Sequence, residues 1–353
     1  MRSNLRFFKN SKSLPVDKFF YNVLYDKKFG YYNSKLPFGD KGDFITAPKI
    51  SNLFSEMIGI WLVSTWENYG KPNSFKIVEL GPGDGSLTKI LLKVFEKFPE
   101  FNSIKDLYLF EKSILLRKLQ KKNIDNKKVK WINNLNIIKK GPIIFFGNEF
   151  FDAIPIKQFK RSKKVLLEKY FEKRNSKILE VYKKASSKNK KVINSFKTLN
   201  NLKFIEYPMK GFFELKRIIN KIIDLQGCLL LIDYGYLKPN NLNTLQSVIN
   251  HKKNPLLKNL GKADITSHVN FSLLNEFLKK NNLKVKKIIS QREFLINMGI
   301  EKRAELVSKK MRFLDKSNIY LRLKRLLSPS LMGSLFKVSL SYNFKKNDYF
   351  GFK

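Results

Sequence analysis

A turn with three glycines, set between an apolar run and a helical pattern, constrains the fold of this chain more than any other feature. The run Lys76-Ile-Val-Glu-Leu80 leads directly into Gly81-Pro-Gly-Asp-Gly85, and a helical pattern begins near Ser86. Because glycine has no Cβ, the backbone of such a turn can approach a ligand closely. A plain tight turn has the same composition, so both interpretations stay open on this motif alone.

Short apolar runs alternate with helical patterns through the middle of the chain. A helix is predicted over residues 87–98, and a second begins within residues 114–119. Near-continuous apolar strands are typical of a parallel sheet buried on both faces. We therefore predict an α/β fold with a Rossmann-like, doubly wound sheet. The predicted strands are Phe75 to Leu80, Asp106 to Phe110, Val129 to Ile132, Pro142 to Phe146 and Cys228 to Ile232.

Three regions are expected along the chain. Residues 1–70 form the first, with an apolar helix from about Leu53 to Trp66. Residues 71–310 form the core, and residues 311–353 form a C-terminal extension. Within the core, residues 161–201 are rich in lysine and weakly periodic, which predicts a solvated surface insertion or a mobile loop.

The charge of the chain is extreme but evenly spread. Lys and Arg number 70 against 29 Asp and Glu, a formal charge of +41, and only 11 of the basic residues are Arg. Proteins that read nucleic acids cluster their charge and use the fork of Arg. The even spread of Lys along the chain indicates instead that the genome has drifted toward A/T-rich codons. Nucleic acid is therefore not the expected partner, although weak nonspecific RNA binding stays open.

Cysteine and histidine are scarce. Cys228 is the only cysteine, which excludes an intramolecular disulfide and a multi-cysteine zinc site, and with only His251 and His268 we expect no metal. Cys228 lies in the apolar run Gly227 to Tyr236, so a buried, inert thiol is expected. That run is too short to span a bilayer, and no membrane insertion is expected.

Two further positions narrow the ligand of the glycine turn. A dinucleotide fingerprint needs Gly or Ala where this chain has Ser86, and no phosphate-loop lysine follows, so a pyrophosphate or triphosphate ligand is disfavoured. Glu111 ends the next predicted strand, where a carboxylate can accept hydrogen bonds from ribose hydroxyls. A surface glutamate before a helix capped by Ser113 is the alternative. The turn from Glu79 to Gly85, with Glu111, favours an adenosine ligand without pyrophosphate, and S-adenosylmethionine is the leading candidate.

Asn148, Glu149 and Asp152 follow the fourth predicted strand, at the end of the sheet where ligands of α/β proteins bind. Glu149 and Asp152 share one face if this segment is helical. One interpretation is a helix start whose acids complement the helix dipole. The other is a carboxylate pair that holds a guanidinium, whose nitrogen is a poor nucleophile until a base or strong hydrogen bonding frees its lone pair. Methyl transfer would then depend largely on in-line positioning.

A set of motifs from about residue 14 to 310 occurs together in a specific order and spacing. They are Leu24-Tyr-Asp with Phe29-Gly-Tyr-Tyr32, Gly42-Asp-Phe-Ile-Thr-Ala-Pro48, Val78 to Gly85, Asn148-Glu-Phe-Phe-Asp-Ala153, Leu231-Ile-Asp-Tyr-Gly-Tyr236, Thr244-Leu-Gln with His251, Ala263-Asp-Ile-Thr-Ser-His-Val-Asn-Phe271 and Gln291 to Gly299. With them, the chain resembles the MidA family of methyltransferases, which includes the mitochondrial complex I assembly arginine methyltransferase.

The resemblance implies a class I methyltransferase fold, with a seven-stranded sheet whose final strand is reversed and an N-terminal helical cap. It carries the family's glycine motif onto Gly81, Gly83 and Gly85, and the ribose acid onto Glu111. The loop that contains Asp43, Thr46 and Pro48 resembles a substrate-side lid, with a turn-rich linker as the alternative. His268 is placed on the substrate side. It lies with Asp264 in one motif that matches the family, and Asp233 lies in another. None of these three residues has an assigned chemical role.

The resemblance also implies symmetric dimethylation of an arginine on a protein subunit of a respiratory NADH dehydrogenase. Since the chain begins about a dozen residues before the family pattern, we expect a bacterial cytoplasmic member, with the mitochondrial matrix as the alternative. A bacterial member can modify another protein. Two other hypotheses stay open: a noncatalytic assembly chaperone that holds a partner with its N-terminal cap, and an RNA methyltransferase, suggested only by the charge.

Overall fold

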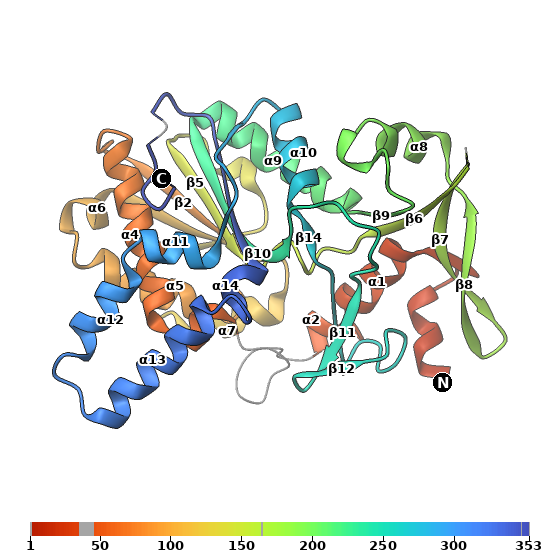
Figure 1. The fold of residues 1–353 in the computed structure, drawn as a ribbon, viewed down its shortest axis with the longest axis horizontal. Coiled ribbons are helices and arrows are strands. Elements are labelled where there is room, and N and C mark those ends of the chain that lie inside the picture. The colour runs from red at the N-terminus through yellow and green to blue at the C-terminus, as the bar shows by residue number, and fades with distance from the viewer. Residues whose placement is uncertain (1, 35–45, 164, 347, 353) are drawn as a thin grey trace. The chain divides into compact units, whose positions relative to one another are not determined.

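The computed structural model describes residues 2–34, 46–163, 165–346 and 348–352, and the chain divides into two compact units (Figure 1). Residues 45–150, 217–235 and 281–353 form one, which we term the sheet unit. Residues 1–44, 151–216 and 236–280 form the other, the insert unit. The insert unit is thus assembled from three separate stretches of chain, which interrupt the sheet unit twice.

A mixed sheet is the centre of the sheet unit. Its strands are β2 (Phe75–Leu80), β3 (Lys105–Phe110), β4 (Val129–Ile132), β5 (Ile143–Asn148), β10 (Gly227–Tyr236), β15 (Lys284–Val285), β16 (Ile289–Ser290) and β17 (Phe336–Tyr342). The order is β15-β17-β10-β5-β2-β3-β4. Neighbours from β10 to β4 pair in parallel, whereas β17 pairs antiparallel with both β10 and β15. This order confirms the predicted doubly wound sheet and its reversed final strand.

Both faces of the sheet are buried, because successive side chains of a strand point to opposite faces. On one face, Ile77 and Ile144 pack in a cluster with Trp61 of helix α4 (Asn52–Asn68) and with helix α5 (Ser86–Phe95). The alternate residue Phe145 is fully buried as well. Burial on both faces explains why these strands are continuous apolar runs. The predicted helices correspond to α4, α5 and α7 (Ile114–Asn123).

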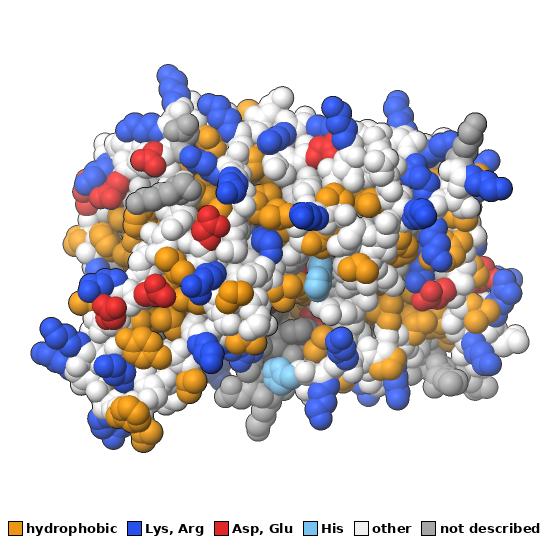
Figure 2. Space-filling model, in the orientation of Figure 1, with side chains coloured by type: hydrophobic (Ala, Val, Ile, Leu, Met, Phe, Trp, Pro, Cys, Tyr) orange, Lys and Arg blue, Asp and Glu red, His pale blue; other side chains and the backbone are white. Residues whose placement is uncertain are grey.

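The other helices of the sheet unit are shorter or lie toward the C-terminus. They are α3 (Ala47–Ile50), α6 (Pro99–Ile104), η2 (Leu135–Ile137), α11 (Gln291–Asn297), α12 (Ile300–Ser308), α13 (Phe313–Leu327) and α14 (Met332–Leu335), and α9 (Met209–Leu225) runs from the insert unit into the sheet unit. No helix in the described part of the chain combines the length and the apolar composition needed to cross a bilayer. Basic side chains are spread over the face drawn in Figure 2.

The insert unit contains an antiparallel sheet of order β1-β7-β6-β9, with β8 paired to β7, and a small sheet β12-β11-β13. In its apolar core, Phe8 packs against Phe19, and Phe19 packs against Phe171 of β7. The elements are η1 (Arg2–Phe8), β1 (Ser13–Pro15), α1 (Val16–Tyr25), α2 (Tyr31–Ser34), β6 (Lys157–Ser162), β7 (Val165–Arg174), β8 (Lys177–Lys184), α8 (Ser187–Asn194), η3 (Lys197–Leu199), β9 (Phe204–Tyr207), β11 (Gln246–Ile249), β12 (Lys252–Asn254), β13 (Asp264–Thr266), β14 (Val269–Asn270) and α10 (Phe271–Lys280).

Of the two alternatives predicted for the lysine-rich segment 161–201, a surface insertion or a mobile loop, the structure contradicts the loop. The segment forms the β7–β8 hairpin, closed at the pair Arg174↔Lys177, and then helix α8. Leu166 and Phe171 of β7 are buried, while many of the lysines lie on the exposed side. The mobile-loop alternative was wrong because a hairpin with one solvated, charged face has nearly the composition of a disordered loop.

The terminal regions also group differently from the expected boundaries. Helices α3 and α4, placed with the first 70 residues, pack in the sheet unit. Strand β17, placed in a C-terminal extension, lies inside the central sheet. These helices and this strand complete the apolar core around the sheet. Domain boundaries drawn as consecutive ranges of residues cannot describe a core built from distant parts of the chain.

Candidate active site

The glycine turn joins β2 to α5 and has a backbone that other residues would strain. Gly81, Gly83 and Gly85 have φ values of +63°, +59° and +84°, in the left-handed region. The Gly81 N–H donates to the carbonyl of Phe110 at 3.1 Å, which fixes the turn to the end of β3. A Cβ at Gly81 would lie 2.9 Å from the ring of Phe150. Conformation and packing therefore both require glycine here.

Asp84, between the last two glycines, stabilises the turn from within. Its carboxylate accepts a hydrogen bond from the Ser86 N–H at 3.1 Å, at the start of α5. The same carboxylate forms an ion pair of 2.6 Å with Lys49 of α3. Thr46 and the buried Pro48, two predicted substrate-side residues, belong to the segment that Lys49 thereby holds beside the turn. Asp43, the third, lies outside the described residues.

Glu79 lies one residue before the end of β2 and is buried. Its carboxylate accepts a hydrogen bond from the hydroxyl of Thr88 on α5. Burial raises the pKa of Glu79 to about 7, with a further rise from Asp84 and an opposing effect of the Thr88 hydrogen bond. Glu79 therefore links the strand and the helix on either side of the turn and titrates near neutral pH.

Glu111 follows β3 and is joined to the glycine turn by Gln120 of α7. Its carboxylate accepts the Ser113 N–H at 2.7 Å and the Gln120 amide at 3.4 Å. The same Gln120 Nε2 donates to the carbonyl of Gly83 at 2.8 Å, and its Oε1 accepts from the Trp131 indole at 3.0 Å. Burial raises the pKa of Glu111, against the lowering by these hydrogen bonds. The turn and the acid, about 28 residues apart in the sequence, are thus held in one network.

Sequence reasoning missed Gln120, which is fully buried. A signal for it exists: it follows the buried Leu116 by four residues on α7, so it is a polar residue on the apolar face of that helix. A buried amide must find hydrogen-bond partners, and here its partners are the two predicted parts of the site.

Asn148 and Glu149 lie where β5 ends, at the carboxyl edge of the sheet. The Asn148 Nδ2 donates to the Glu149 carboxylate at 3.1 Å, and the Asn148 Oδ1 is buried with no partner among the described residues. Glu149 has φ of +52°, in the left-handed region, and its N–H donates to the carbonyl of Ile232 at 2.9 Å. The next residue, Phe150, packs against the glycine turn.

The segment after Glu149 is a bend and a turn, so the predicted helix start is wrong, and Glu149 and Asp152 do not share a helix face. Asp152 belongs to the insert unit and is buried, and its backbone carbonyl accepts the Ser267 N–H at 3.1 Å. His268 is also in the insert unit, where its N–H donates to the Thr244 hydroxyl at 3.0 Å. Burial lowers the pKa of the His268 imidazole.

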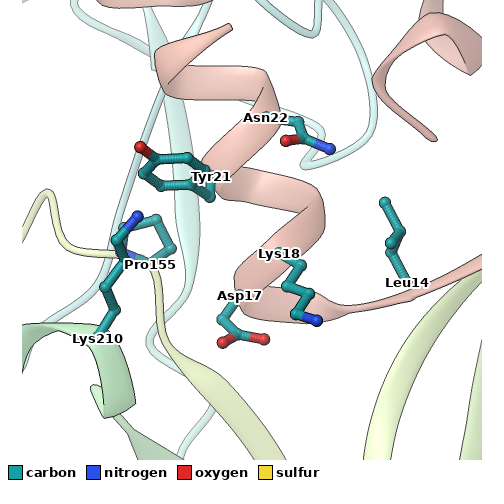
Figure 3. A pocket seen from close by; sticks show the side chains of 7 residues that line it. All are labelled: Leu14, Asp17, Lys18, Tyr21, Asn22, Pro155 and Lys210. Carbon is teal, nitrogen blue, oxygen red and sulfur yellow. The ribbon is translucent and has the colours of Figure 1, made fainter. Parts of the chain in front are cut away.

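A cavity of about 380 Å³ in the insert unit contains none of the predicted site residues (Figure 3). Tyr21 and Asp17 of α1 line it together with Pro155 and Lys210. The Lys210 Nζ lies 3.1 Å from the centre of the Tyr21 ring, a cation–π contact. This cavity is therefore not the candidate active site. Among the described residues, no cluster of histidine, cysteine and acidic side chains could hold a metal.

The family of the chain follows from a model that matches residues 57–289, about two thirds of its length, and that is described as "Putative S-adenosyl-L-methionine-dependent methyltransferase". The chain belongs to this family. The resemblance to methyltransferases is thereby confirmed, and the cofactor is S-adenosyl-L-methionine, as predicted.

Named relatives and solved structures of this methyltransferase family agree. Human "Protein arginine methyltransferase NDUFAF7, mitochondrial" is 29% identical over 339 residues, which cover 88% of this chain and 74% of the human protein. The Caenorhabditis elegans homolog of that protein is 31% identical over 301 residues, 78% of this chain and 70% of the relative. A Burkholderia thailandensis structure bound to S-adenosyl-homocysteine has a TM-score of 0.83 at 22% identity, covering 97% of this chain and 90% of that one. The last likeness confirms the class I methyltransferase fold.

The sheet unit has features that suit this cofactor. Three positions of the turn lack a Cβ, so the backbone is open to a ligand, and a buried carboxylate is held beside them. The unpartnered Asn148 oxygen is an atom of the kind that a bound molecule satisfies. Nothing in the turn resembles the lysine-containing cradle of a triphosphate.

Proposed function

We propose that this methyltransferase modifies protein arginine, adding methyl groups to a guanidinium nitrogen of its substrate. The observation that carries the proposal is the end of β5, where an unpartnered buried amide oxygen of Asn148 adjoins a carboxylate in a strained backbone, Glu149. A non-glycine residue in the left-handed region costs about 1–3 kcal/mol, and such strain clusters at active sites. The name of the relatives supports arginine as the acceptor.

Five residues are proposed to bind the cofactor: Glu79, Gly81, Gly83, Gly85 and Glu111. The glycines would let the backbone of the turn contact the ligand directly. The Glu111 carboxylate would accept hydrogen bonds from the two ribose hydroxyls, and Gln120 would hold that carboxylate in place. Glu79 would fix the turn through Thr88. When bound, S-adenosyl-L-methionine supplies an electrophilic methyl group on a sulfonium.

Asn148, Glu149 and Asp152 are proposed to hold and activate the guanidinium. The Asn148 oxygen and the Glu149 carboxylate would accept its N–H groups, which orients one nitrogen lone pair toward the methyl. As the new N–C bond forms and the S–C bond breaks, one proton leaves the guanidinium, and Glu149 would accept it. Asp152 is the second carboxylate of the proposal.

The proposed substrate is a subunit of a respiratory NADH dehydrogenase or an equivalent protein, and the proposed product is symmetric dimethylarginine. Asp43, Thr46, Pro48 and His268 are proposed to lie on the substrate side. The proposed setting is the bacterial cytoplasm, with the mitochondrial matrix as the alternative, since the named relatives are mitochondrial.

Two variants test this assignment, one expected to lower methyl transfer and the other to lower cofactor affinity. Glu149→Gln keeps the size and hydrogen-bonding ability of the side chain but not its basicity, so transfer of labelled methyl to protein should fall at least about 100-fold. Its affinity for S-adenosyl-homocysteine, measured by calorimetry, should stay unchanged. Glu111→Gln should weaken that affinity at least about tenfold, since one charge-assisted acceptor is lost.

The labelled product decides between the alternatives. Amino-acid analysis should find the label in methylarginine of a protease-sensitive product. Label removed by ribonuclease would establish an RNA methyltransferase instead. Cofactor binding without any labelled product, from cell extracts that contain the complex I subunits, would favour the noncatalytic chaperone.

A further inference from the structure

Helix α13 of the sheet unit has apolar side chains on two opposite sides. Leu323 and Leu326 are buried in the core. Leu314 and Leu321 lie seven residues apart, which places them on one side of the helix, roughly opposite those core leucines. They are 74% and 64% exposed. A helix on the surface of a soluble domain ordinarily has polar residues at such positions.

The exposed apolar surface extends to the beginning of α13. Phe313 is 81% exposed, and Met311 and Tyr320 are exposed as well. Together with Leu314 and Leu321, these three residues form what we term the α13 patch. Figure 2 shows hydrophobic side chains beside basic ones at the lower left, where the connection of α12 to α13 lies in Figure 1. Exposed apolar residues gathered on one element indicate an interaction surface.

Positive charge surrounds the α13 patch. Residues 309–325 contain seven Lys or Arg and a single acid, Asp315, which pairs with Arg312 at 3.1 Å. No ion pair of the other six is found in the described parts of the chain. Three of the 11 Arg of the whole chain lie in these 17 residues. Arg is therefore more frequent in this segment than in the chain as a whole.

We propose that the α13 patch docks on an anionic lipid surface, with α13 lying in the plane of the interface. A helix with exposed Leu and Phe flanked by Lys and Arg places its apolar side among the headgroups, and its cations against anionic lipid. A second copy of the chain would oppose one set of seven cations with another, and like charges repel across an interface. Nucleic acid would leave Leu314 and Leu321 in water, since bases stack on aromatic side chains. The proposal is independent of the acceptor that the enzyme methylates.

Co-flotation of the full chain with vesicles tests the proposal. One vesicle type contains phosphatidylcholine alone, and the other contains phosphatidylcholine with one third phosphatidylglycerol. The variant Leu314→Ser with Leu321→Ser removes apolar surface, and its matched control is Leu242→Ser, since Leu242 is 65% exposed in the insert unit. The variant Lys324→Glu with Arg325→Glu reverses two charges beside Leu321. Its control reverses two exposed charges on α8, Lys190→Glu with Lys191→Glu.

The chain should float with the anionic vesicles and not with phosphatidylcholine alone, and less so as salt is raised. Each α13 variant should bind at least about tenfold more weakly than its control. Circular dichroism and S-adenosyl-homocysteine affinity, both unchanged, would show that the variants fold. No flotation would overturn the proposal, and so would equal losses in the α13 and control variants, which would reflect only net charge. A concentration-dependent dimer that is lost in Leu314→Ser with Leu321→Ser would assign the patch to self-association instead.

Discussion

The buried acids of the cofactor site and those of the insert unit are held in different ways. In the sheet unit, the two acids predicted to bind the cofactor have partners near in the sequence: Glu111 binds the N–H two residues ahead, and Glu79 binds Thr88. Gln120, which the sequence did not reveal, binds Gly83, 37 residues away. In the insert unit, the partners come from distant parts of the sequence. Lys157 binds Asp17, 140 residues away, and Tyr32 binds Asp264, 232 residues away. A polar group whose partner is local is visible in a sequence motif, whereas one whose partner is distant becomes visible only in the fold.

This difference predicts that the insert unit is the more vulnerable to loss of a single polar side chain. Lys157 is buried between two acids, 3.1 Å from Asp17 and 2.6 Å from Glu168. Lys157→Met would leave both carboxylates buried without their cation, which costs about 3–5 kcal/mol of the free energy of unfolding. Chemical denaturation measures the loss. Lys302→Met, which removes an exposed pair with Glu305, should cost less than about 0.5 kcal/mol. Equal losses in the two variants would contradict the comparison.

In the sheet unit, the largest electrostatic effect should be a dependence of stability on pH. The pKa of Glu79 is about 7 in the fold against an ordinary 4.5, so the folded state binds the proton more tightly. Its contribution is fully present below pH 4.5 and is lost as pH rises through 7, which amounts to about 3 kcal/mol. Glu79→Gln mimics the protonated acid and should flatten the fall in melting temperature between pH 5 and 8. The exposed Glu301→Gln is the control, and an unchanged profile in Glu79→Gln would refute the assignment.

The parts of the fold that could be predicted from the sequence are those fixed by local physics. The strand Val129–Ile132 and the glycine turn were predicted because buried parallel strands are apolar runs and left-handed turns need glycine. The β7–β8 hairpin could not be predicted, since the charged residues on its exposed face obscure the alternation of apolar and polar residues that is typical of a strand. The division into units depends on strand pairings such as Ser13↔Glu172, which join residues too far apart in the sequence to appear in one local pattern.

The candidate site shows the same limit. The glycines and Glu111 were predicted to lie together because both follow neighbouring strands. Gln120, which joins them, was missed because a single polar letter on a helix does not reveal its partners. The helix expected after Glu149 is absent, because the left-handed backbone of that residue turns the chain out of β5 instead.

Gln120→Leu tests whether the network in the sheet unit depends on this one missed residue. The substitution keeps the volume but leaves the Gly83 carbonyl and the Trp131 indole without their partner, at a cost of about 1–3 kcal/mol. If the network orders the cofactor site, affinity for S-adenosyl-homocysteine should fall about tenfold, by calorimetry. Asn123→Leu is the matched control on the same helix, since Asn123 donates to the Asp84 carbonyl, also in the turn. A similar small loss of affinity in both variants would show that Gln120 has no special part.

The smallest loss of stability is expected from the Tyr32–Asp264 pair of the insert unit. This pair tests directly whether partners distant in the sequence stabilise that unit. The Tyr32 hydroxyl lies 3.1 Å from each carboxylate oxygen of Asp264, which also accepts the Ile265 N–H at 2.8 Å. Burial and the nearby Asp264 raise the pKa of Tyr32, so the phenol stays protonated and donates throughout the neutral range. Tyr32→Phe removes only that donor, and because the backbone N–H remains, the free energy of unfolding should fall by about 1 kcal/mol. Tyr21→Phe, at an exposed tyrosine, is the control and should change nothing measurable. If Tyr32→Phe instead left stability intact and abolished methyl transfer, the Tyr32–Asp264 pair would serve the reaction and not the fold, which would contradict the comparison.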